Sequence, residues 1–384
     1  MLLSVGNPPY GAKLQNDEQK HYEIESKESA ILFMLLSYKL LKPQGLHSFI
    51  IPKPFIFSST WEKIRAKLKD DIYAIVDCAK VWEEVKLEQI IYSLQKDVSS
   101  GSYENLLLKN SEFLHIAHID KYLCDEFGFF VNGVMQIEIE IGLKMRQIKT
   151  SLLDLASESN RGGMFQKEVK NSGDLKVLGG INIQRCELRD VKGFVNKTTE
   201  LTQNSYLREN SVIVQEIIAH IQNPTDHIKI TGTILENISG YSIIDTVQQI
   251  SLHQEISNRY VLALIHSNLI NWYVYRFIFA KAIRTMHLSN QIIKRIPVPN
   301  ISHAKQEPFI QLVDEILESK QKIKDYKTLL DEAIKTDNFA REIKLKKELD
   351  LLESRVLACE NEIDAMVYKL YDLTDEEIKI VEGK

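Results

Sequence analysis

Apolar and polar positions follow two alternating periods along the first third of the chain. Apolar side chains recur at helical spacing over residues 28–41, and Lys-Pro-Gln-Gly then marks the end of the predicted helix. Strands are predicted over 46–51, 72–76 and 89–94, with a short amphipathic helix over 61–68. Strands that alternate with helices indicate an α/β sheet, here of about four strands, which is few for a complete doubly wound domain.

The middle of the chain has a different pattern of apolar and polar residues. Residues 133–150 have the spacing of a helix that leads into this region. From Arg161 onward, short β-branched runs lie between Gly-rich turns, which is typical of an irregular, strand-rich domain. Residues 260–282 are predicted to form one long apolar helix, and Ile-Pro-Val-Pro at 296–299 ends the region.

Two long helices are predicted in the last part of the chain. Apolar residues recur at three- and four-residue spacing from Phe309 to Leu330. After a break at 336–338, a heptad series runs from Leu345 to Leu370. Two such helices with a short connection are expected to form an antiparallel hairpin. The predicted fold class is α/β plus α+β, followed by this hairpin, with domains at 1–110, 111–300 and 301–384.

Composition narrows the classes of protein. The 384 residues are 44% hydrophobic and 26% charged, as in soluble globular proteins. No apolar run is long enough to span a bilayer, so we expect a cytoplasmic protein with no membrane partner. Cysteines 78, 124, 186 and 359 lie far apart without a CxxC pair. Neither a metal site nor a disulfide framework is therefore predicted.

Charge is unevenly distributed, although the net charge is only −5. Residues 1–150 carry 18 Lys and Arg against 20 Asp and Glu, residues 151–300 carry 16 against 13, and residues 301–384 carry 14 against 20. The middle region is the net basic one, so a site for a polyanion is most plausibly placed there.

The most informative motif is Asn7-Pro8-Pro9-Tyr10. A short apolar strand precedes it, and the two prolines end that strand and begin a loop. The helix ending in Leu-Leu-Lys-Pro-Gln-Gly and the strand ending in Ile-Ile-Pro follow in order. This series resembles the amino-methyltransferases that act on adenine in DNA, of the type II or type IIG restriction–modification kind. A Pro-rich turn without catalytic meaning is the alternative for the motif alone.

The resemblance implies roles for the loop residues. The Asn7 side-chain oxygen and the Pro8 carbonyl would accept the two protons of the adenine amine, and so orient its lone pair for methyl transfer. Pro8 and Pro9 would stiffen the loop, and Tyr10 would stack on an adenine flipped out of duplex DNA. Trp82, in the stretch 80–85 before a strand, is the candidate for a second stacking aromatic. Its alternative role is packing at the edge of the sheet.

The resemblance extends along most of the chain. Leu-Gly-Gly-Ile-Asn-Ile from residue 178, the apolar stretch 260–277 and the exit at 296–299 resemble a TaqI-like specificity domain, that is, a target recognition domain. Candidate contacts to DNA phosphates or guanine edges are its basic residues. These are Arg161, Lys167, Lys170, Arg185, Arg189, Arg284 and His287. A plain solvated charge is the alternative for each one.

The methyl-donor motifs of such enzymes are not found in this sequence. They comprise a Gly-containing loop and an acidic residue that precede the NPPY loop, which here starts at residue 7. We therefore expect residues 1–110 to be the C-terminal half of a Rossmann-like methyltransferase sheet. S-adenosylmethionine is expected for the complete enzyme and is not expected to bind this chain alone. The missing N-terminal half, on the same or a separate polypeptide, is the expected partner besides double-stranded DNA.

Three functions stay open at this point. The first is a site-specific DNA adenine methyltransferase, present as a fragment without its donor-binding half. The second is a sequence-specific DNA-binding module whose methyltransferase half is vestigial and does not catalyse. The third, a helical assembly subunit, fits only the last 84 residues, 301–384. No nuclease motif of the PD…(D/E)xK type is found in the sequence.

Overall fold

The chain forms two compact units. The computed structural model describes residues 1–21, 26–82, 88–219, 228–282 and 284–384. Unit 1 comprises Met1–Gly142 and Tyr275–Arg284, and unit 2 comprises Leu143–Val274 and Thr285–Lys384. A short segment from late in the chain therefore belongs to the N-terminal unit.

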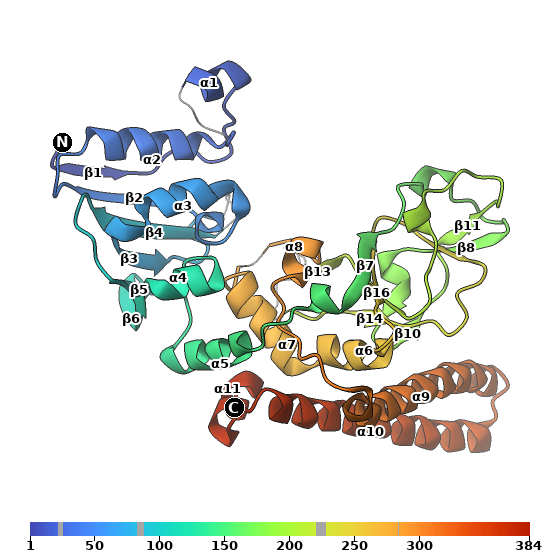
Figure 1. The fold of residues 1–384 in the computed structure, drawn as a ribbon. Coiled ribbons are helices and arrows are strands. Elements are labelled where there is room, and N and C mark those ends of the chain that lie inside the picture. Colours follow the sequence, from blue (N-terminus) through green and yellow to red (C-terminus); the bar gives the residue numbers. More distant parts are fainter. Residues whose placement is uncertain (22–25, 83–87, 220–227, 283) are drawn as a thin grey trace. The chain divides into compact units, whose positions relative to one another are not determined.

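Unit 1 is built on a six-stranded mixed sheet with the order β1-β2-β4-β3-β5-β6 (Figure 1). The strands are β1 (Leu3–Gly6), β2 (Leu46–Pro52), β3 (Ile72–Asp77), β4 (Gln89–Gln95), β5 (Ser102–Lys109) and β6 (Glu112–Asp120). Strands β1, β2, β3 and β5 run parallel to one another, and β4 and β6 run the opposite way. The loops that follow the four parallel strands therefore share one end of the sheet, called here the carboxyl end.

The structure confirms most of the elements predicted in this unit. The predicted helices correspond to α2 (Ser29–Leu40) and α3 (Glu62–Leu68), and the three predicted strands to β2, β3 and β4. The prediction of about four strands is wrong, because β5 and β6 add a hairpin that turns at Asn110 and Ser111. The first four residues of β6 are exposed, so this strand lacks the alternating pattern that marks a half-buried strand.

Helices and aromatic side chains complete unit 1. The remaining helices are α1 (Asn16–His21), α4 (Tyr122–Phe127) and α5 (Gln136–Gln147), the last of which lies in the predicted helix 133–150. Helix α2 packs beside β2 (Figure 1). Phe55 is fully buried and stacks on Tyr92 of β4 and on Phe130, with ring centroids 5.3 and 5.8 Å apart. These rings join the sheet to the segment that follows α4.

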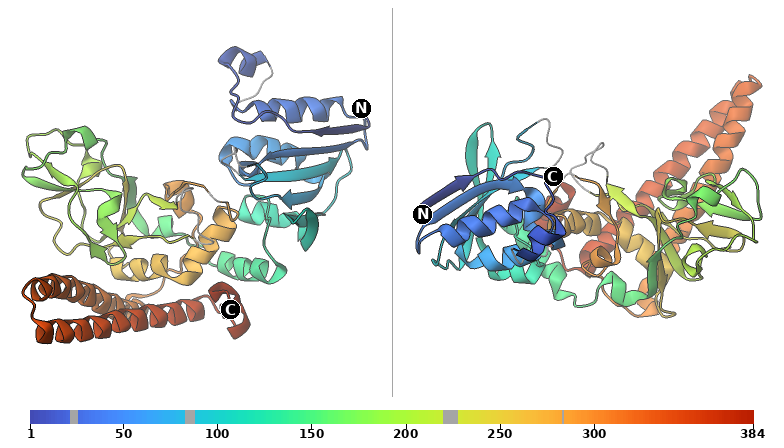
Figure 2. Two further views of the ribbon diagram at one scale, coloured as in Figure 1. Left: turned by 180° about the vertical axis from the view of Figure 1, so that it is seen from behind. Right: turned by 90° about the horizontal axis from the view of Figure 1, so that it is seen from above.

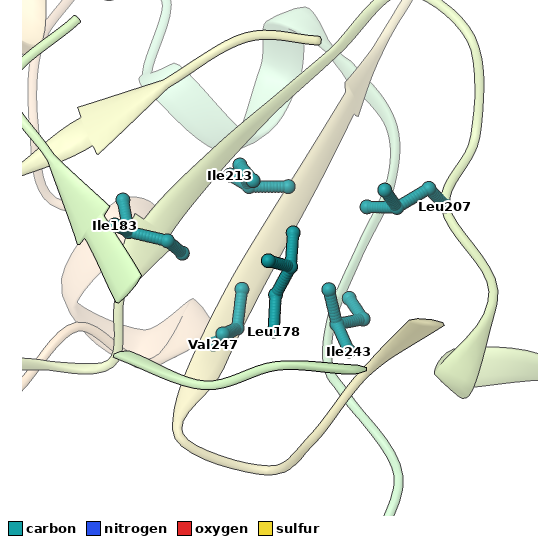
Figure 3. Close-up of a cluster of buried hydrophobic side chains, with 6 residues drawn as sticks. All are labelled: Leu178, Ile183, Leu207, Ile213, Ile243 and Val247. Atoms are coloured by element: carbon teal, nitrogen blue, oxygen red, sulfur yellow. The ribbon is translucent and has the colours of Figure 1, made fainter. Parts of the chain in front are cut away.

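Unit 2 contains short strands in four small sheets, in line with its irregular sequence pattern. The sheet orders are β14-β12-β16-β7, β11-β8-β15, β10-β9 and β13-β17. The strands are β7 (Ala156–Arg161), β8 (Leu175–Leu178), β9 (Ile183–Gln184), β10 (Glu187–Leu188), β11 (Gly193–Val195), β12 (Ser211–Gln215), β13 (Ile217–Ala219), β14 (Gly232–Thr233), β15 (Tyr241–Ile243), β16 (Val247–Leu252) and β17 (Met286–His287). Figure 3 shows the buried cluster that joins several of these sheets. Its members are Leu178, Ile183, Leu207, Ile213, Ile243 and Val247.

The single long helix predicted over 260–282 is wrong. The structure has α6 (Asn258–His266), α7 (Asn268–Tyr273) and a π-helical turn, η8 (Val274–Ile278). Ser267 separates the first two, with an extended backbone and a hydroxyl that accepts from the Ile270 N–H, 3.3 Å away. A serine in this position caps the start of a new helix. The break is invisible in the apolar pattern, because both helices are buried along most of their length.

The last part of the chain is helical. After the short α8 (Asn290–Ile293), helices α9 (His303–Lys335) and α10 (Phe339–Leu370) pack side by side, and α11 (Asp375–Glu382) follows (Figures 1 and 2). The turn at 336–338 lies where the sequence predicts a break, and the Asn338 side chain caps α10 by accepting from the Arg341 N–H. Among the helices of the described residues, none is long and apolar enough to cross a bilayer.

Candidate functional site

The NPPY loop follows β1 at the carboxyl end of the unit 1 sheet. Asn7 and Pro9 are exposed, Pro8 is buried and Tyr10 is half-buried. The Tyr10 hydroxyl donates to the Ile50 carbonyl of β2 over 3.0 Å, and the Ser29 hydroxyl at the start of α2 donates to the Pro9 carbonyl over 3.4 Å. Burial, with a smaller contribution from Cys78, raises the pKa of Tyr10 to about 12, so this hydroxyl stays neutral. The loop is thus fastened to β2 and α2 by its second half.

Tyr10 and Trp82 form an aromatic pair. Their ring centroids lie 6.2 Å apart and their planes are inclined by 54°. Tyr10 follows β1 and half-buried Trp82 follows β3, so the pair joins loops after two parallel strands. Residues 83–85 of the predicted stretch 80–85 lie outside the described residues. The structure therefore brings together the two aromatic residues singled out from the sequence.

A buried lysine lies at the same end of the sheet. Lys53 comes directly after β2, and its side chain is 2% exposed. Its ammonium group contacts the Asp77 carboxylate at 2.7 Å and the Glu88 carboxylate at 3.3 Å. Burial works against the Lys53 ammonium, but the two carboxylates outweigh it and raise the pKa of Lys53. These three residues are called the lysine cluster.

The late segment Tyr275–Arg284 reaches this cluster within unit 1. The Lys281 carbonyl accepts from the Lys53 ammonium over 3.3 Å, and the Lys281 ammonium donates to the Gly133 carbonyl over 2.8 Å. Burial lowers the pKa of Lys281. The segment is held further by Phe277, whose ring stacks on Phe127 with centroids 4.7 Å apart.

Gly142 makes room for that ring. A Cβ atom at Gly142 would lie 2.7 Å from Phe277 Cζ, so a larger residue of α5 would displace the ring. The Arg276 guanidinium also pairs with buried Glu138 at 2.5 Å. The late segment is therefore an integral part of unit 1 and not a loose connection.

Two of the predicted DNA contacts come together in unit 2. Arg161, at the end of β7, and His287, in β17, both approach Glu216, whose side chain is 4% exposed. The His287 Nδ1 atom is 2.8 Å from the carboxylate, and the Arg161 Nε atom is 3.7 Å from it. Arg161 also donates to the Asp245 carbonyl over 2.9 Å. Both basic side chains are about half exposed, so each is held by Glu216 and still presents part of its surface to solvent.

The other predicted contacts have different surroundings. Arg185 donates to the His266 carbonyl over 3.0 Å and lies 3.6 Å from Glu360, so its guanidinium is already engaged within unit 2. Lys167, Lys170 and Arg189 are exposed. Arg284 belongs to unit 1, where it lies over the Phe57 ring at 5.8 Å, and burial lowers its pKa. Among the described residues of unit 2, no ion pair joins Lys167, Lys170, Arg185 or Arg189 to Arg161 or His287.

The cysteines and acidic residues give no sign of a metal centre. All four cysteines are free and buried. Among the described residues, no group of three or more His, Cys, Asp or Glu side chains could hold a metal ion.

Sequence reasoning missed Lys53, Asp77, Glu88 and Glu216. The available signal was weak: Lys53 and Asp77 are charged residues next to the ends of apolar strands, where a solvated position is the usual interpretation. The contact of Lys53 with Asp77 spans 24 residues of sequence and its contact with Glu88 spans 35, so no local pattern encodes them.

The segment that contains the NPPY loop is similar to a known family. Residues 4–82 match the family model described as the Eco57I restriction-modification methylase. This segment holds β1 from its second residue onward, all of β2 and β3, and both members of the aromatic pair. No curated protein matches the chain.

Solved structures extend the likeness to the fold of nearly the whole chain. The type IIL restriction-modification enzyme MmeI, solved in complex with DNA, is similar over 98% of this chain with a TM-score of 0.58 and 9% identity. The chain spans 55% of the MmeI chain. The DrdV–DNA complex matches over 83% of this chain and 44% of its own, with 13% identity and a TM-score of 0.42. The likeness to MmeI concerns the fold alone.

Proposed function

We propose that the chain is the target-base and DNA-recognition part of a site-specific DNA adenine methyltransferase of a restriction–modification system. The observation that carries the proposal is the aromatic pair beside the Asn7-Pro8 loop, in the segment that matches a restriction-modification methylase. Two aromatic faces beside exposed Asn7 suit a flat base that has been turned out of a duplex.

The roles of the loop residues follow from the chemistry of an aromatic amine. The lone pair of the adenine amine is delocalised into the ring, so the amine is a poor nucleophile. The Asn7 side-chain oxygen and the Pro8 carbonyl accept its two protons, which localises the lone pair and aims it. Tyr10 and Trp82 hold the ring while this happens. S-adenosylmethionine supplies the methyl group when it is bound.

Donor binding is assigned to a complementary half. At the carboxyl end of the sheet the carboxylates of Asp77 and Glu88 both contact the Lys53 ammonium, so these two described carboxylates serve the lysine cluster. Among the described residues of this end, the exposed Asn7 and the aromatic pair are the ones that suit a flat base. This supports a division of labour in which this chain holds the adenine and its partner holds the donor.

Strand β1 offers a surface for that partner. It lies at one edge of the sheet, and β2 is its one partner among the described strands. Leu3 and Val5 on it are 60% and 72% exposed, and Phe33 and Leu40 of the neighbouring α2 are exposed as well. A bare apolar edge strand favours pairing with a further strand. We therefore place the complementary half at this edge.

A lysine on the edge strand tests the placement. Leu3→Lys is expected to abolish co-purification of the chain with its complementary half, because a charge on a pairing edge opposes strand addition. Phe113→Lys, on exposed β6 at the opposite edge, is the matched control and is expected to leave co-purification intact. Equal binding by both variants would place the complementary half elsewhere.

The function itself is tested by methyl transfer. Labelled S-adenosylmethionine is incubated with plasmid DNA and this chain, alone or with the complementary half, and the modified base is identified. The proposal predicts N6-methyladenine only when both halves are present. Sequence-selective DNA binding without methyl transfer in either case would instead establish the DNA-binding specificity module. Salt-independent binding, or no binding to any duplex, would contradict both functions.

A further inference from the structure

The connection between β3 and β4 carries Trp82 and has an unusual backbone. Ala79 has φ +49°, a left-handed conformation that a non-glycine residue adopts only at an energetic cost. The Asp77 Oδ1 atom accepts from the Ala79 N–H over 2.9 Å, and the Ala79 carbonyl accepts from the Gln89 N–H over 2.9 Å. These contacts hold the chain in the conformation that turns it toward Trp82.

A second contact holds the chain one residue before Trp82. The Gln89 Oε1 atom accepts from the Val81 N–H over 2.9 Å. Gln89 is fully buried at the start of β4, so its side chain is a fixed point of the sheet. The segment 78–82 is therefore fastened at Ala79 and again at Val81.

Lys53 orients the carboxylate of Asp77 that holds Ala79. Its ammonium group binds Asp77 Oδ2 at 2.7 Å, while the other oxygen of the same carboxylate binds Ala79. The Glu88 carboxylate and the Lys281 carbonyl complete its surroundings. Removing Lys53 would leave two carboxylates together at a buried position, and they would repel one another. Asp77 would then lose the orientation that holds Ala79.

We propose that Lys53 and Gln89 are positioning residues for the aromatic pair: together they fix the segment 78–82 so that Trp82 lies opposite Tyr10. The role of the aromatic pair in holding a flipped base rests on the proposed function. The placement of Trp82 by Lys53 and Gln89 does not. Neither Lys53 nor Gln89 is assigned a contact to the base. They act through Asp77, Ala79 and Val81.

Acrylamide quenching of tryptophan fluorescence measures the placement of Trp82 in the whole chain without DNA. The chain has three tryptophans, and Trp61 and Trp272 are buried, so the half-buried Trp82 dominates the quenching. Subtracting the signal of the Trp82→Phe variant isolates it. Lys53→Met and Gln89→Met are each expected to raise the Stern–Volmer constant of Trp82.

Lys121→Met is the matched control. Lys121 is also a buried lysine of unit 1, but its ammonium group binds the Asp70 carbonyl just before the start of β3, away from the carboxyl end. This variant is expected to leave Trp82 quenching unchanged. If Lys53→Met does not fold, as judged by circular dichroism, Gln89→Met decides, because it leaves no unpaired buried charge. Unchanged Trp82 quenching in a folded Gln89→Met chain would overturn the proposal.

A kinetic measurement separates positioning from general damage. In the enzyme completed with its other half, Gln89→Met is expected to lower kcat by about 100-fold, as misplacement of a reacting group does, while KM for DNA stays unchanged. An equal change in kcat for Lys121→Met would contradict a positioning role. If the completed wild-type enzyme transfers no methyl group, the proposed function fails, and the quenching result still decides where Lys53 and Gln89 place Trp82.

Discussion

The carboxyl end of the unit 1 sheet and the basic surface of unit 2 hold their charges in opposite ways. In unit 1 the Lys53 ammonium is buried and two carboxylates surround it. In unit 2 the carboxylate of Glu216 is buried, and the basic groups of Arg161 and His287 lie half exposed around it. The first arrangement fixes a loop and exposes no charge. The arrangement in unit 2 holds two basic side chains in place while part of each stays accessible to a polyanion.

Under the proposed function, this difference corresponds to two different tasks. Chemistry on a base needs acceptors and rings that are already in place, because misplacement by about 1 Å costs a large part of the rate. Binding to a duplex depends on phosphate contacts that are individually weak and add up. A buried ionic cluster suits the first task, and basic side chains held at the surface suit the second.

The largest test of the comparison is a stability measurement on Lys53→Met. Breaking a buried ion pair by removing one partner costs about 3–5 kcal/mol, since the remaining charges are left uncompensated. Arg161→Met removes a half-exposed partner and is expected to cost less than about 1 kcal/mol. Urea denaturation followed by circular dichroism measures both. Equal losses would remove the distinction between the two regions.

Asp364 in α10 sharpens the comparison, because it is a half-buried carboxylate of unit 2. Burial raises its pKa to about 6, although the Asn268 N–H and Arg185 favour its charged form. The unfolded carboxyl has the lower pKa, so ionisation of Asp364 weakens the fold as the pH rises from about 4 to about 6.

Asp364→Asn tests this assignment. The Asn side chain keeps the oxygen that accepts from Asn268 and removes the charge. The variant is expected to be more stable than the wild type at pH 7, by up to about 3 kcal/mol for a shift of about two pKa units. At pH 4 the advantage is expected to disappear. Thermal denaturation at both pH values measures it, and an advantage that is the same at pH 4 and pH 7 would contradict the assignment.

The smallest expected effect concerns the exposed lysines of unit 2. The double variant Lys167→Ala, Lys170→Ala is expected to lose up to about two phosphate contacts. Each lost contact reduces the slope of log binding constant against log salt concentration by about 0.9. Lys63→Ala, Lys67→Ala on α3 is the matched control in unit 1 and is expected to leave the slope unchanged. Binding isotherms at several salt concentrations measure both. An unchanged slope for the first variant would make these lysines solvated charges without a partner.

Local patterns in the sequence predicted the local parts of this structure. The prolines of the NPPY loop end β1 as expected, and the helix before Lys-Pro-Gln-Gly is α2. The partnership of Tyr10 with Trp82 came from resemblance to a family and not from spacing. The lysine cluster could not be predicted, because its members are far apart in sequence and each looks like a surface charge beside a strand end. The break at Ser267 was hidden because the helices on both sides of it are buried along most of their length.

The most direct test of the central claim is the rate of methyl transfer by the Asn7→Ala variant combined with the proposed complementary half. Loss of an acceptor that acts on the reacting amine is expected to lower the rate by at least about 100-fold, with DNA affinity unchanged. Asn196→Ala, at an exposed position of unit 2, is the control and is expected to keep the full rate. A wild-type rate for Asn7→Ala would contradict the account of this loop as the target-base site.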